Sequence, residues 1–521
     1  MKNIKLLILM IGIMTFSISC DNILNLTNPN QQDTSNYWQT EDDLINGLNA
    51  AYRPLRFNGS YRRWLHILYV SRSDEGYSTS PNPTFQSYSN FKTINNDGAE
   101  AVLYTWLDLY KGIFWANQVL DNAPNAPIKN EVYRNRIMGQ AYFLRGLGYF
   151  NIAGVYGRGP ITLTSFVEDN PVVFDQQDIY LQAQKDFDEA RKRLPAYWED
   201  TKDLGRITRG SALGMLAKVA AQLHKWEDVK VWCDSIYNLK NGSGQPLYSL
   251  VSSYRDNFTT TNENNSESLF EVQFMSGPVN GVGQLSHERA KFLGLPANGC
   301  SYDDGTASNI VKTDLEMEKT VDGKVDPRLK HTLFYYDPTS PSEIFYGKTW
   351  VQWENDGGSS VMRSKVYWKK YTNYDTRTSE DHENNGSNFR VVRLADIYLL
   401  YAEALNELGR TAESYEYINK VRRRVNLPDL QNSTVFTGIG NDQAKMREQI
   451  MHERSCELAG ESWRWLDLER WGMFDSETKI NYLKQRDSEF GNFVIGKSNR
   501  FPIPYREVNL VPNLKQNPGY E

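Results

Sequence analysis

Paired amphipathic helices are the feature that most constrains how this 521-residue chain can fold. Within residues 208–239, apolar side chains recur with the 3.6-residue period of a helix, first along one run and then along a second. His224 and Lys225 separate the two runs, and small residues such as Gly210 and Gly214 are expected to let the two helices approach closely. A helix pair of about 34 residues is typical of the tetratricopeptide repeat. The sequence therefore predicts a mostly α-helical fold built on a tetratricopeptide-like repeat scaffold.

The same helical period recurs elsewhere in the chain. A second pair is expected at residues 394–408 and 411–425, joined at Gly409 and ended by Pro428. Further helical patterns cover residues 41–52, 101–120, 136–155, 442–459 and 463–471. Helices are thus expected near both ends of the chain.

Residues 241–390 differ in character from the helical parts. They are rich in Asn, Gly, Ser, Asp and aromatic residues, with short β-like runs at 269–274 and 361–368. The shorter stretch 71–97 is similar. Binding residues usually lie on loops that a rigid scaffold holds, so these two stretches are where ligand binding is expected.

Three parts of one domain follow from this division. They are an N-terminal helical part with the repeats, a variable loop-rich segment with short strands, and a C-terminal helical part with a terminal tail. Their expected boundaries are 41–240, 241–390 and 391–521.

The first twenty residues predict export and membrane anchoring. Two lysines precede an apolar run at residues 6–16, and small residues lead to Cys20. The run is shorter than the roughly 20 residues of a transmembrane helix. The pattern predicts a signal peptide at residues 1–19, lipid on Cys20, and a polar lipidated tether at residues 20–40. Ser17 stands where leucine is usual, so plain secretion is the alternative.

Charge and cysteine content exclude some functions. The formal net charge is −6 and no long basic run is present, whereas nucleic-acid binding needs clustered Lys and Arg. Besides Cys20, the chain has Cys233, Cys300 and Cys456, an odd number at wide spacing that does not predict a disulfide framework. Aromatic residues make up 13%, with 31 Tyr, and their flat rings suit stacking on sugars. A nucleic-acid partner is not expected.

Short motifs follow one another over nearly the whole chain. In chain order they include Trp106-x3-Tyr110-x2-Ile113-x3-Asn117, Tyr142-Phe143-Leu144-Arg145, Gly210-Ser211-Ala212, Asp326-Pro327-Arg328-Leu329, Val392-Arg393-Leu394-Ala395-Asp396, Glu453-Arg454-x2-Glu457-Leu458-Ala459-x-Glu461-x-Trp463-Arg464-Trp465-x-Asp467, and Pro512-Asn513-Leu514-x-Gln516-Asn517-Pro518-Gly519-Tyr520. In this order, behind a lipidation signal, they resemble the SusD/RagB family of outer-membrane lipoproteins from Bacteroidetes.

The resemblance implies a SusD-like fold and a function without chemistry. It implies a lipoprotein on the outer face of the outer membrane that captures oligosaccharides and delivers them to a TonB-dependent, SusC-like transporter. No catalytic residue and no cofactor are expected.

The charged motif residues are expected to hold the fold, because buried charges persist in helices when they are paired. These residues are Arg145, Arg393, Glu403, Glu453, Arg454, Asp467 and Arg470. The tryptophans of the last helical block, Trp463, Trp465 and Trp471, are expected in the core.

Sugar binding requires flat apolar faces and hydrogen-bonding groups on exposed loops. The candidates in the first loop are Arg72, Asp74, Tyr77, Phe85 and Tyr88, and those in the second are Tyr302, Asp303, Tyr335, Tyr336, Tyr346, Trp350, Trp353 and Arg377. We expect exposed Tyr and Trp rings to stack on sugars while the polar groups select hydroxyl geometry.

Two alternatives stay open: the same architecture could bind peptides, or the chain could be a secreted hydrolase. Asp303 and Asp304 could serve glycoside hydrolysis, but adjacent residues in a Gly-flanked loop are usually only solvated. His452 and Cys456 lie at i and i+4, as the ligands of zinc helices do, yet no third ligand is evident. The sequence therefore predicts no metal site.

Overall fold

The computed structural model describes residues 37–93, 100–276, 285–296, 301–302, 304–357, 363–380 and 385–521. The expected signal peptide, Cys20, most of the expected tether and Asp303 lie outside these residues. Within the described part of the chain, every helix is too short or too polar to cross a bilayer.

Helices dominate the structure. They are α3 Glu41–Tyr52, α4 Trp64–Ser71, α5 Pro83–Ser89, α6 Glu100–Asn122, α7 Glu131–Val155, α8 Gln176–Arg193, α9 Arg209–Gln222, α10 Trp226–Tyr237, α11 Arg289–Leu293, α12 Asn309–Glu316, α13 Leu329–Thr332, α14 Trp350–Gly357, α15 Leu394–Glu407, α16 Thr411–Arg424, α17 Gln443–Leu458, α18 Arg464–Arg470, α19 Glu477–Arg486 and α20 Tyr505–Leu510. The predicted mostly α-helical fold on a helical-repeat scaffold is confirmed.

The strands are short and antiparallel. They are β1 Gly76–Tyr77, β2 Arg158–Pro160, β3 Val173–Asp175, β4 Ser268–Val272, β5 Thr306–Ala307, β6 Leu333–Phe334, β7 Ile344–Phe345, β8 Lys348–Thr349, β9 Tyr367–Trp368 and β10 Phe389–Arg393. They pair in twos, β1 with β5, β2 with β3, β4 with β10, β6 with β9 and β7 with β8. The pairs β1–β5, β4–β10 and β6–β9 join segments that are distant in the sequence, whereas β2–β3 and β7–β8 each lie within one connection.

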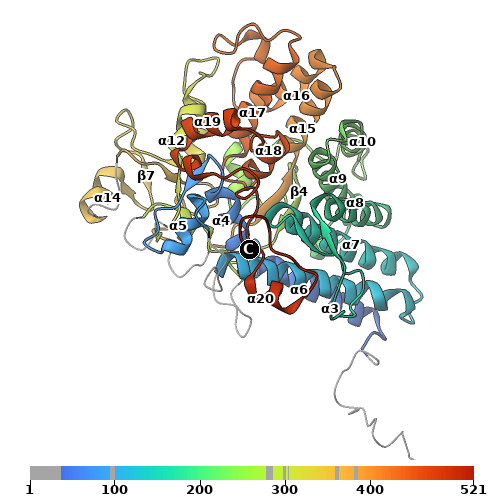
Figure 1. Ribbon diagram of the computed structural model, residues 1–521. Coiled ribbons are helices and arrows are strands. Elements are labelled where there is room, and N and C mark those ends of the chain that lie inside the picture. Colours follow the sequence, from blue (N-terminus) through green and yellow to red (C-terminus); the bar gives the residue numbers. More distant parts are fainter. Residues whose placement is uncertain are drawn as a thin grey trace, which may run out of the picture.

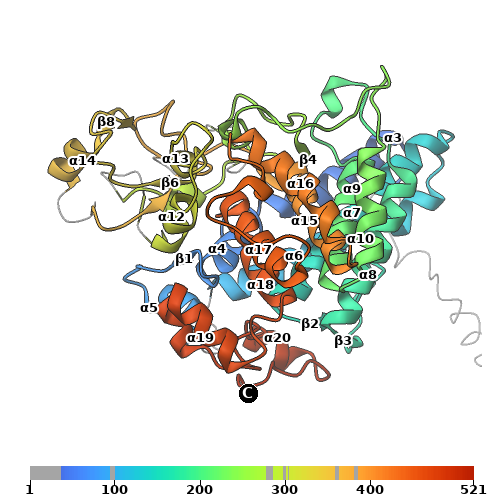
Figure 2. The same cartoon turned by 90° about the horizontal axis from the view of Figure 1, so that it is seen from above.

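Successive helices form a continuous array. Helix α7 packs between α6 and α8, α9 packs against α8 and α10, and α15 follows α10 and packs against α16 and α17. Figures 1 and 2 show α7–α10 on one side of the molecule, while α14 and the short strands β7 and β8 lie on the opposite side. The array is thus the scaffold on which the loop-rich part is mounted.

Helix starts follow from capping side chains. Thr40 caps α3 and Thr208 caps α9. Each threonine side chain accepts from the backbone N–H of the third helical residue, whose own side chain accepts from the backbone N–H of the threonine. Asp442 accepts hydrogen bonds from two backbone amides at the start of α17. These residues explain why the periodic runs begin where the sequence predicted.

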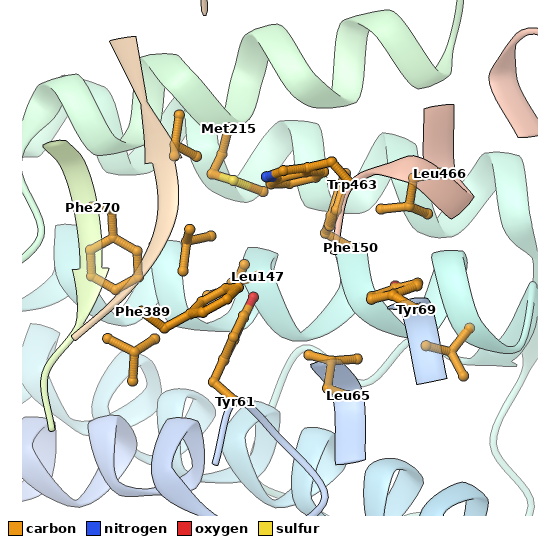
Figure 3. Packing of buried hydrophobic residues seen from close by; sticks show 14 of the residues in the cluster. Tyr61, Leu65, Tyr69, Leu147, Phe150, Met215, Phe270, Phe389, Trp463 and Leu466 are labelled. Carbon is orange, nitrogen blue, oxygen red and sulfur yellow. The ribbon is translucent and has the colours of Figure 1, made fainter. Parts of the chain in front are cut away.

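The main core joins distant parts of the chain. Figure 3 shows Tyr61, Leu65 and Tyr69 near Leu147 and Phe150 of α7, with Phe270 and Phe389 from the β4–β10 pair and Trp463 from the C-terminal part. Trp463 and Trp465 are buried, as predicted, and Trp471 is half-buried. The helical scaffold and the strand pair therefore share one core.

Details of the scaffold differ from the sequence-based expectation, and helix α7 begins at Glu131, five residues earlier than predicted. A Cβ added at Gly210 would lie 2.0 Å from the Tyr248 hydroxyl, and one at Gly214 would lie 2.9 Å from Val392. These glycines thus admit Tyr248 and strand β10, not the partner helix α10. Helix α8, which the sequence analysis did not include, completes the array between α7 and α9.

Candidate ligand-binding surface

The two predicted loops meet at a short strand pair. Gly76 and Tyr77 of β1 pair with Ala307 and Thr306 of β5. Ser78 donates through its hydroxyl to the carbonyl of Asp304 at 2.7 Å. Residues 76–80, 301–302 and 304–307 therefore lie side by side, and we call them the loop junction.

Tyr302 supplies an exposed ring at the loop junction. Its exposed fraction is 52%, and its backbone N–H donates to the carbonyl of Lys291 at 2.7 Å. The ring packs edge-on against Phe292, with 5.4 Å between ring centroids, and Phe292 in turn packs against buried Trp64. The ring is thus held by a rigid apolar base while half of its surface faces solvent.

Polar groups surround this ring. The Lys291 ammonium lies 4.7 Å from the Tyr302 ring centroid. The Asp304 carboxylate accepts a hydrogen bond from the Ser80 hydroxyl, and burial raises the pKa of Asp304. Arg63, which forms an ion pair with Glu288, lies with its guanidinium 4.5 Å from the Phe292 ring centroid. Lys291 thus lies over the Tyr302 ring, while Asp304 contacts Ser80 and Arg63 contacts Phe292. An exposed ring with polar groups nearby is a feature of sugar-binding sites.

Sequence reasoning missed the base and the cations of this surface. Phe292 and Lys291 lie in α11, a five-residue helix whose pattern is too short to predict. Arg63 precedes α4 in a run of two arginines and a tryptophan. That run is the sequence pattern from which a cation at this surface could have been predicted.

The exposure of the predicted ligand residues was mostly wrong. Of the twelve that the structure describes, Tyr302 alone is exposed, and Tyr77, Tyr335, Tyr336 and Arg377 are intermediate. The other seven are buried: Arg72, Asp74, Phe85, Tyr88, Tyr346, Trp350 and Trp353.

Arg72 and Asp74 fasten the first loop to the C-terminal part. Arg72 donates to the carbonyl of Ser498 at 2.7 Å, and Asp74 accepts from Arg464 at 2.7 Å. Burial alone would raise the pKa of Asp74, but Arg464 and Arg486 hold it below its usual range. Both predicted ligand residues are therefore structural.

Phe85 and Tyr88 lie in helix α5, where the sequence analysis expected a loop. Pro83 at the first position and the Asn82 cap start this helix. The Phe85 ring packs against Trp64 and the Tyr88 ring against Phe501, which explains the burial of both.

Trp350 and Trp353 belong to a small second core with Phe334, Phe345 and Tyr346. Trp353 donates through its indole N–H to the carbonyl of Phe345 at 2.9 Å, and its exposed fraction is 2%. The short strands here cannot bury enough apolar surface by themselves, so the large rings supply this core. The expectation of exposed platforms at Trp350, Trp353 and Tyr346 was therefore wrong.

Arg377 lines an open hollow of about 740 Å³ beside this second core, together with Ile344, Tyr374 and Thr378. Tyr336 lies near Arg363, whose guanidinium is 4.3 Å from its ring centroid. The hollow and the loop junction share no described residue. The one aromatic side chain among the described residues that line the hollow, Tyr374, packs against Phe334 of the second core, so the loop junction is the stronger candidate site.

The charged motif residues form the buried network that the sequence predicted. Arg393 bonds Glu267 and Glu461, each at 2.8 Å, and also contacts Glu457. The other ion pairs are Arg328 with Glu453, Arg422 with Glu453, Arg454 with Asp467, Arg470 with Glu403, Lys370 with Glu461 and Arg145 with Asp186. These residues hold elements together and are not a ligand surface.

The His452–Cys456 pair lies inside the fold. The Cys456 sulfur is 3.5 Å from His452 Nε2, and burial raises the pKa of the Cys456 thiol. Cys233 and Cys456 are free buried thiols. Among the described residues, no group of three or more His, Cys, Asp or Glu side chains is placed to hold a metal ion.

Glu75, beside the loop junction, is expected to make stability depend on pH. Burial raises its pKa from 4.5 to about 8, although the Gly460 N–H donates to it at 3.1 Å. Between these two values the folded protein keeps a proton that the unfolded chain releases, so stability falls as pH rises, by at most about 1.4 kcal/mol per pH unit. The variant Glu75→Gln should match the parent near pH 4 and exceed it near pH 8 in urea unfolding.

The matched control for this experiment is Glu448→Gln, because Glu448 is an exposed residue of α17. It should leave the pH profile of the unfolding midpoint unchanged. If the stabilities of Glu75→Gln and the parent changed with pH in parallel, the pKa of Glu75 would not be raised in the folded protein, and the prediction would be wrong.

Comparisons with known proteins agree with this geometry. Residues 223–520 match the model of the SusD family, and residues 23–220 match a model described as starch-binding associating with outer membrane. "SusD-like protein P25" of Formosa agariphila is 27% identical, with 93% of each chain covered.

Solved structures give the same fold. A SusD superfamily protein from Bacteroides vulgatus has a TM-score of 0.79 at 24% identity, covering 93% of this chain and 100% of that one. A structure named "Laminarin binding SusD-like protein" has a TM-score of 0.74 at 25% identity with the same coverage. Since the first family model alone spans more than half of the sequence, the resemblance is confirmed and the chain belongs to the SusD family.

Proposed function

We propose that this protein is a non-catalytic glycan-binding lipoprotein that captures oligosaccharides at the loop junction and hands them to a TonB-dependent, SusC-like transporter. The observation that carries the proposal is the half-exposed Tyr302 ring, backed by Phe292 and flanked by hydrogen-bonding groups. Family membership supports the ligand class, and a structure similar to this chain is named for laminarin binding.

Binding would rest on stacking and on exchange of hydrogen bonds. In this proposal the exposed part of the Tyr302 ring stacks on a sugar ring, and nearby polar groups such as the Asp304 carboxylate bond its hydroxyls. Each hydroxyl contact replaces one to water and contributes on the order of 1 kcal/mol. We therefore expect dissociation constants of roughly micromolar to millimolar, with stacking as the largest single contribution.

The protein would act at the outer face of the outer membrane. In this proposal residues 1–19 are removed, Cys20 carries lipid, and residues 20–40 tether one SusD-like domain of residues 41–521. The three-part division at residues 240 and 390 places the loop junction between the helical start and the loop-rich segment. Bound oligosaccharide then passes to the transporter without being cleaved.

Replacing Tyr302 by alanine tests the site. The variant should bind glycan at least about tenfold more weakly, because the stacking face is lost. Its melting temperature should stay nearly unchanged, because the ring is half in solvent. Calorimetric titration of glycan and peptide panels against the soluble chain measures the first effect, and thermal unfolding measures the second.

Tyr505→Ala is the matched control, because Tyr505 is 49% exposed on α20 and lies outside the loop junction. Equal glycan affinity in the Tyr302 and Tyr505 variants would refute the assignment of the site. Binding of peptides alone would favour the peptide-binding alternative, and turnover of a bound polysaccharide would favour a hydrolase.

A further inference from the structure

A second cavity, of about 450 Å³, lies where α8 and the end of α9 approach α18 and residues 499–500. Its volume is within the range of about 300–1,000 Å³ that small-molecule sites occupy. It is lined by polar side chains from segments far apart in the sequence, including Gln176, Tyr180, Gln222, Glu469, Asn499 and Arg500. None of its lining residues belongs to the loop junction.

The cavity contains a hydroxyl that the fold leaves unsatisfied. Tyr180 is 3% exposed, and its hydroxyl lies near Gln176 but makes no hydrogen bond of ordinary geometry among the described residues. An unmet buried hydroxyl is costly, so a ligand or solvent group that bonds to it gains free energy. The Tyr180 hydroxyl is therefore the group in this cavity that gains most from a hydrogen bond to a ligand.

The remaining polar groups form a fixed wall. Arg500 donates to the Gln176 carboxamide oxygen at 2.6 Å, and the Gln176 amide donates to the Glu469 carboxylate at 3.2 Å. Arg500 also forms an ion pair with Glu469. Because these three side chains hold one another, they are pre-organised for a ligand.

The charge of the cavity is balanced. Glu469 is compensated by Arg500, and the other lining arginine, Arg470, is committed to Glu403 and Asp467. An anionic ligand would find no uncommitted guanidinium on this wall and would meet the carboxylates of Glu469 and Asp475. The lining thus favours an uncharged ligand.

The donor and acceptor pattern narrows the ligand class. Carboxamides and a phenol can each donate and accept, a carboxylate accepts and a guanidinium donates. A sugar hydroxyl likewise both donates and accepts. Phe474 also lines the cavity, but its ring is 1% exposed and packs against Trp465, so the polar groups carry the recognition.

We propose that this cavity is a second carbohydrate site, which takes one neutral sugar residue with a hydroxyl bonded to Tyr180. The choice of carbohydrate rests on the proposed function, whereas the site itself rests on the cavity and its unsatisfied hydroxyl. In this proposal the loop junction binds oligosaccharide, and the separate cavity binds one sugar residue.

Saturation-transfer NMR on the full mature chain tests this with D-glucose, D-galactose, D-mannose and D-xylose as probes. At least one should bind with a roughly millimolar dissociation constant. Tyr180→Phe removes only the hydroxyl and should weaken that binding about threefold to tenfold. Gln222→Ala should weaken it as well.

Tyr237→Phe is the matched control, because the Tyr237 hydroxyl is also buried with no hydrogen-bond partner in the described parts of the chain but lies outside the cavity. It should leave sugar binding unchanged. Absence of binding by all four sugars at roughly 50 mM, or unchanged binding in Tyr180→Phe, would overturn the inference.

The two proposals fail separately. Oligosaccharide binding that depends on Tyr302, with no monosaccharide in the cavity, would remove the second site and keep the proposed function. Monosaccharide binding that depends on Tyr180, with oligosaccharide binding indifferent to Tyr302, would remove the loop junction and keep the second site.

Discussion

Replacing Arg393 by alanine is expected to destabilise the protein by about 3–5 kcal/mol, because three buried carboxylates lose the cation that they share. Among the described residues, these carboxylates keep only Arg328, Arg424 and Lys370 as cationic partners. The Arg393 side chain is 2% exposed and bonds Glu267 and Glu461 at 2.8 Å each, with Glu457 also in contact. Three acidic side chains therefore lose a shared cation at once. Denaturant unfolding followed by circular dichroism measures the loss.

The matched control is Arg423→Ala on helix α16. Arg423 forms an ion pair with Asp429 at 2.6 Å, but its side chain is 59% exposed. A solvent-exposed pair contributes at most about 1 kcal/mol. Similar losses for the two variants would contradict the structural role assigned to the buried network.

Replacing Trp465 by alanine is expected to cost about 3–5 kcal/mol of stability, because it opens a large void in the main core. Trp465 is 2% exposed, and its ring lies 4.5 Å from that of Phe474 and stacks near Phe91. Buried Arg72 also lies with its guanidinium 5.4 Å from the Trp465 ring centroid. Thermal and urea unfolding measure the effect.

Trp465→Phe is the conservative comparison and should lose less stability than the alanine variant, because it keeps an aromatic ring in the same space. An unaltered melting curve for Trp465→Ala would contradict its place in the core. The alanine variant should still bind glycan at temperatures where it remains folded, since Trp465 lies outside the loop junction.

Helical periodicity carried most of the fold prediction. The repeat pairs α9–α10 and α15–α16 begin and end close to the predicted residues, because their apolar stripes and capping residues are local signals. Helix α5 was mistaken for a loop, since seven residues with few apolar positions give no clear period. Tertiary packing of Phe85 and Tyr88 decides that segment.

The candidate site was only partly predictable. Tyr302 was identified from its residue type and its Gly-rich loop. The β1–β5 pairing, which joins Tyr77 to Thr306, could not be predicted, because two-residue strands carry no periodicity. Nor does an aromatic residue in a loop reveal whether its ring faces solvent or a small core, which is why Trp350 and Trp353 were misplaced.

For the charged network, residue type predicts that the charges are paired but does not predict which residues form each pair. Helical Arg and Glu residues were expected to be paired, and they are. Which Arg meets which Glu depends on segments that are distant in the sequence, such as Glu267 and Arg393. No local pattern carries that information.

The buried network also dictates the order in which the molecule can be completed. Glu267 and Arg328 come early, but the carboxylates of Glu453 and Glu457, which compensate Arg328 and complete the cluster around Arg393, come with α17 near the end of the chain. A chain truncated before α17 would lack Glu453 and Glu457, so Arg328 would keep only Asp326 and Arg393 only Glu267 among the acidic partners described. Such a chain is expected to form helices but to have a less stable interior, because buried cations would lose their compensating charges.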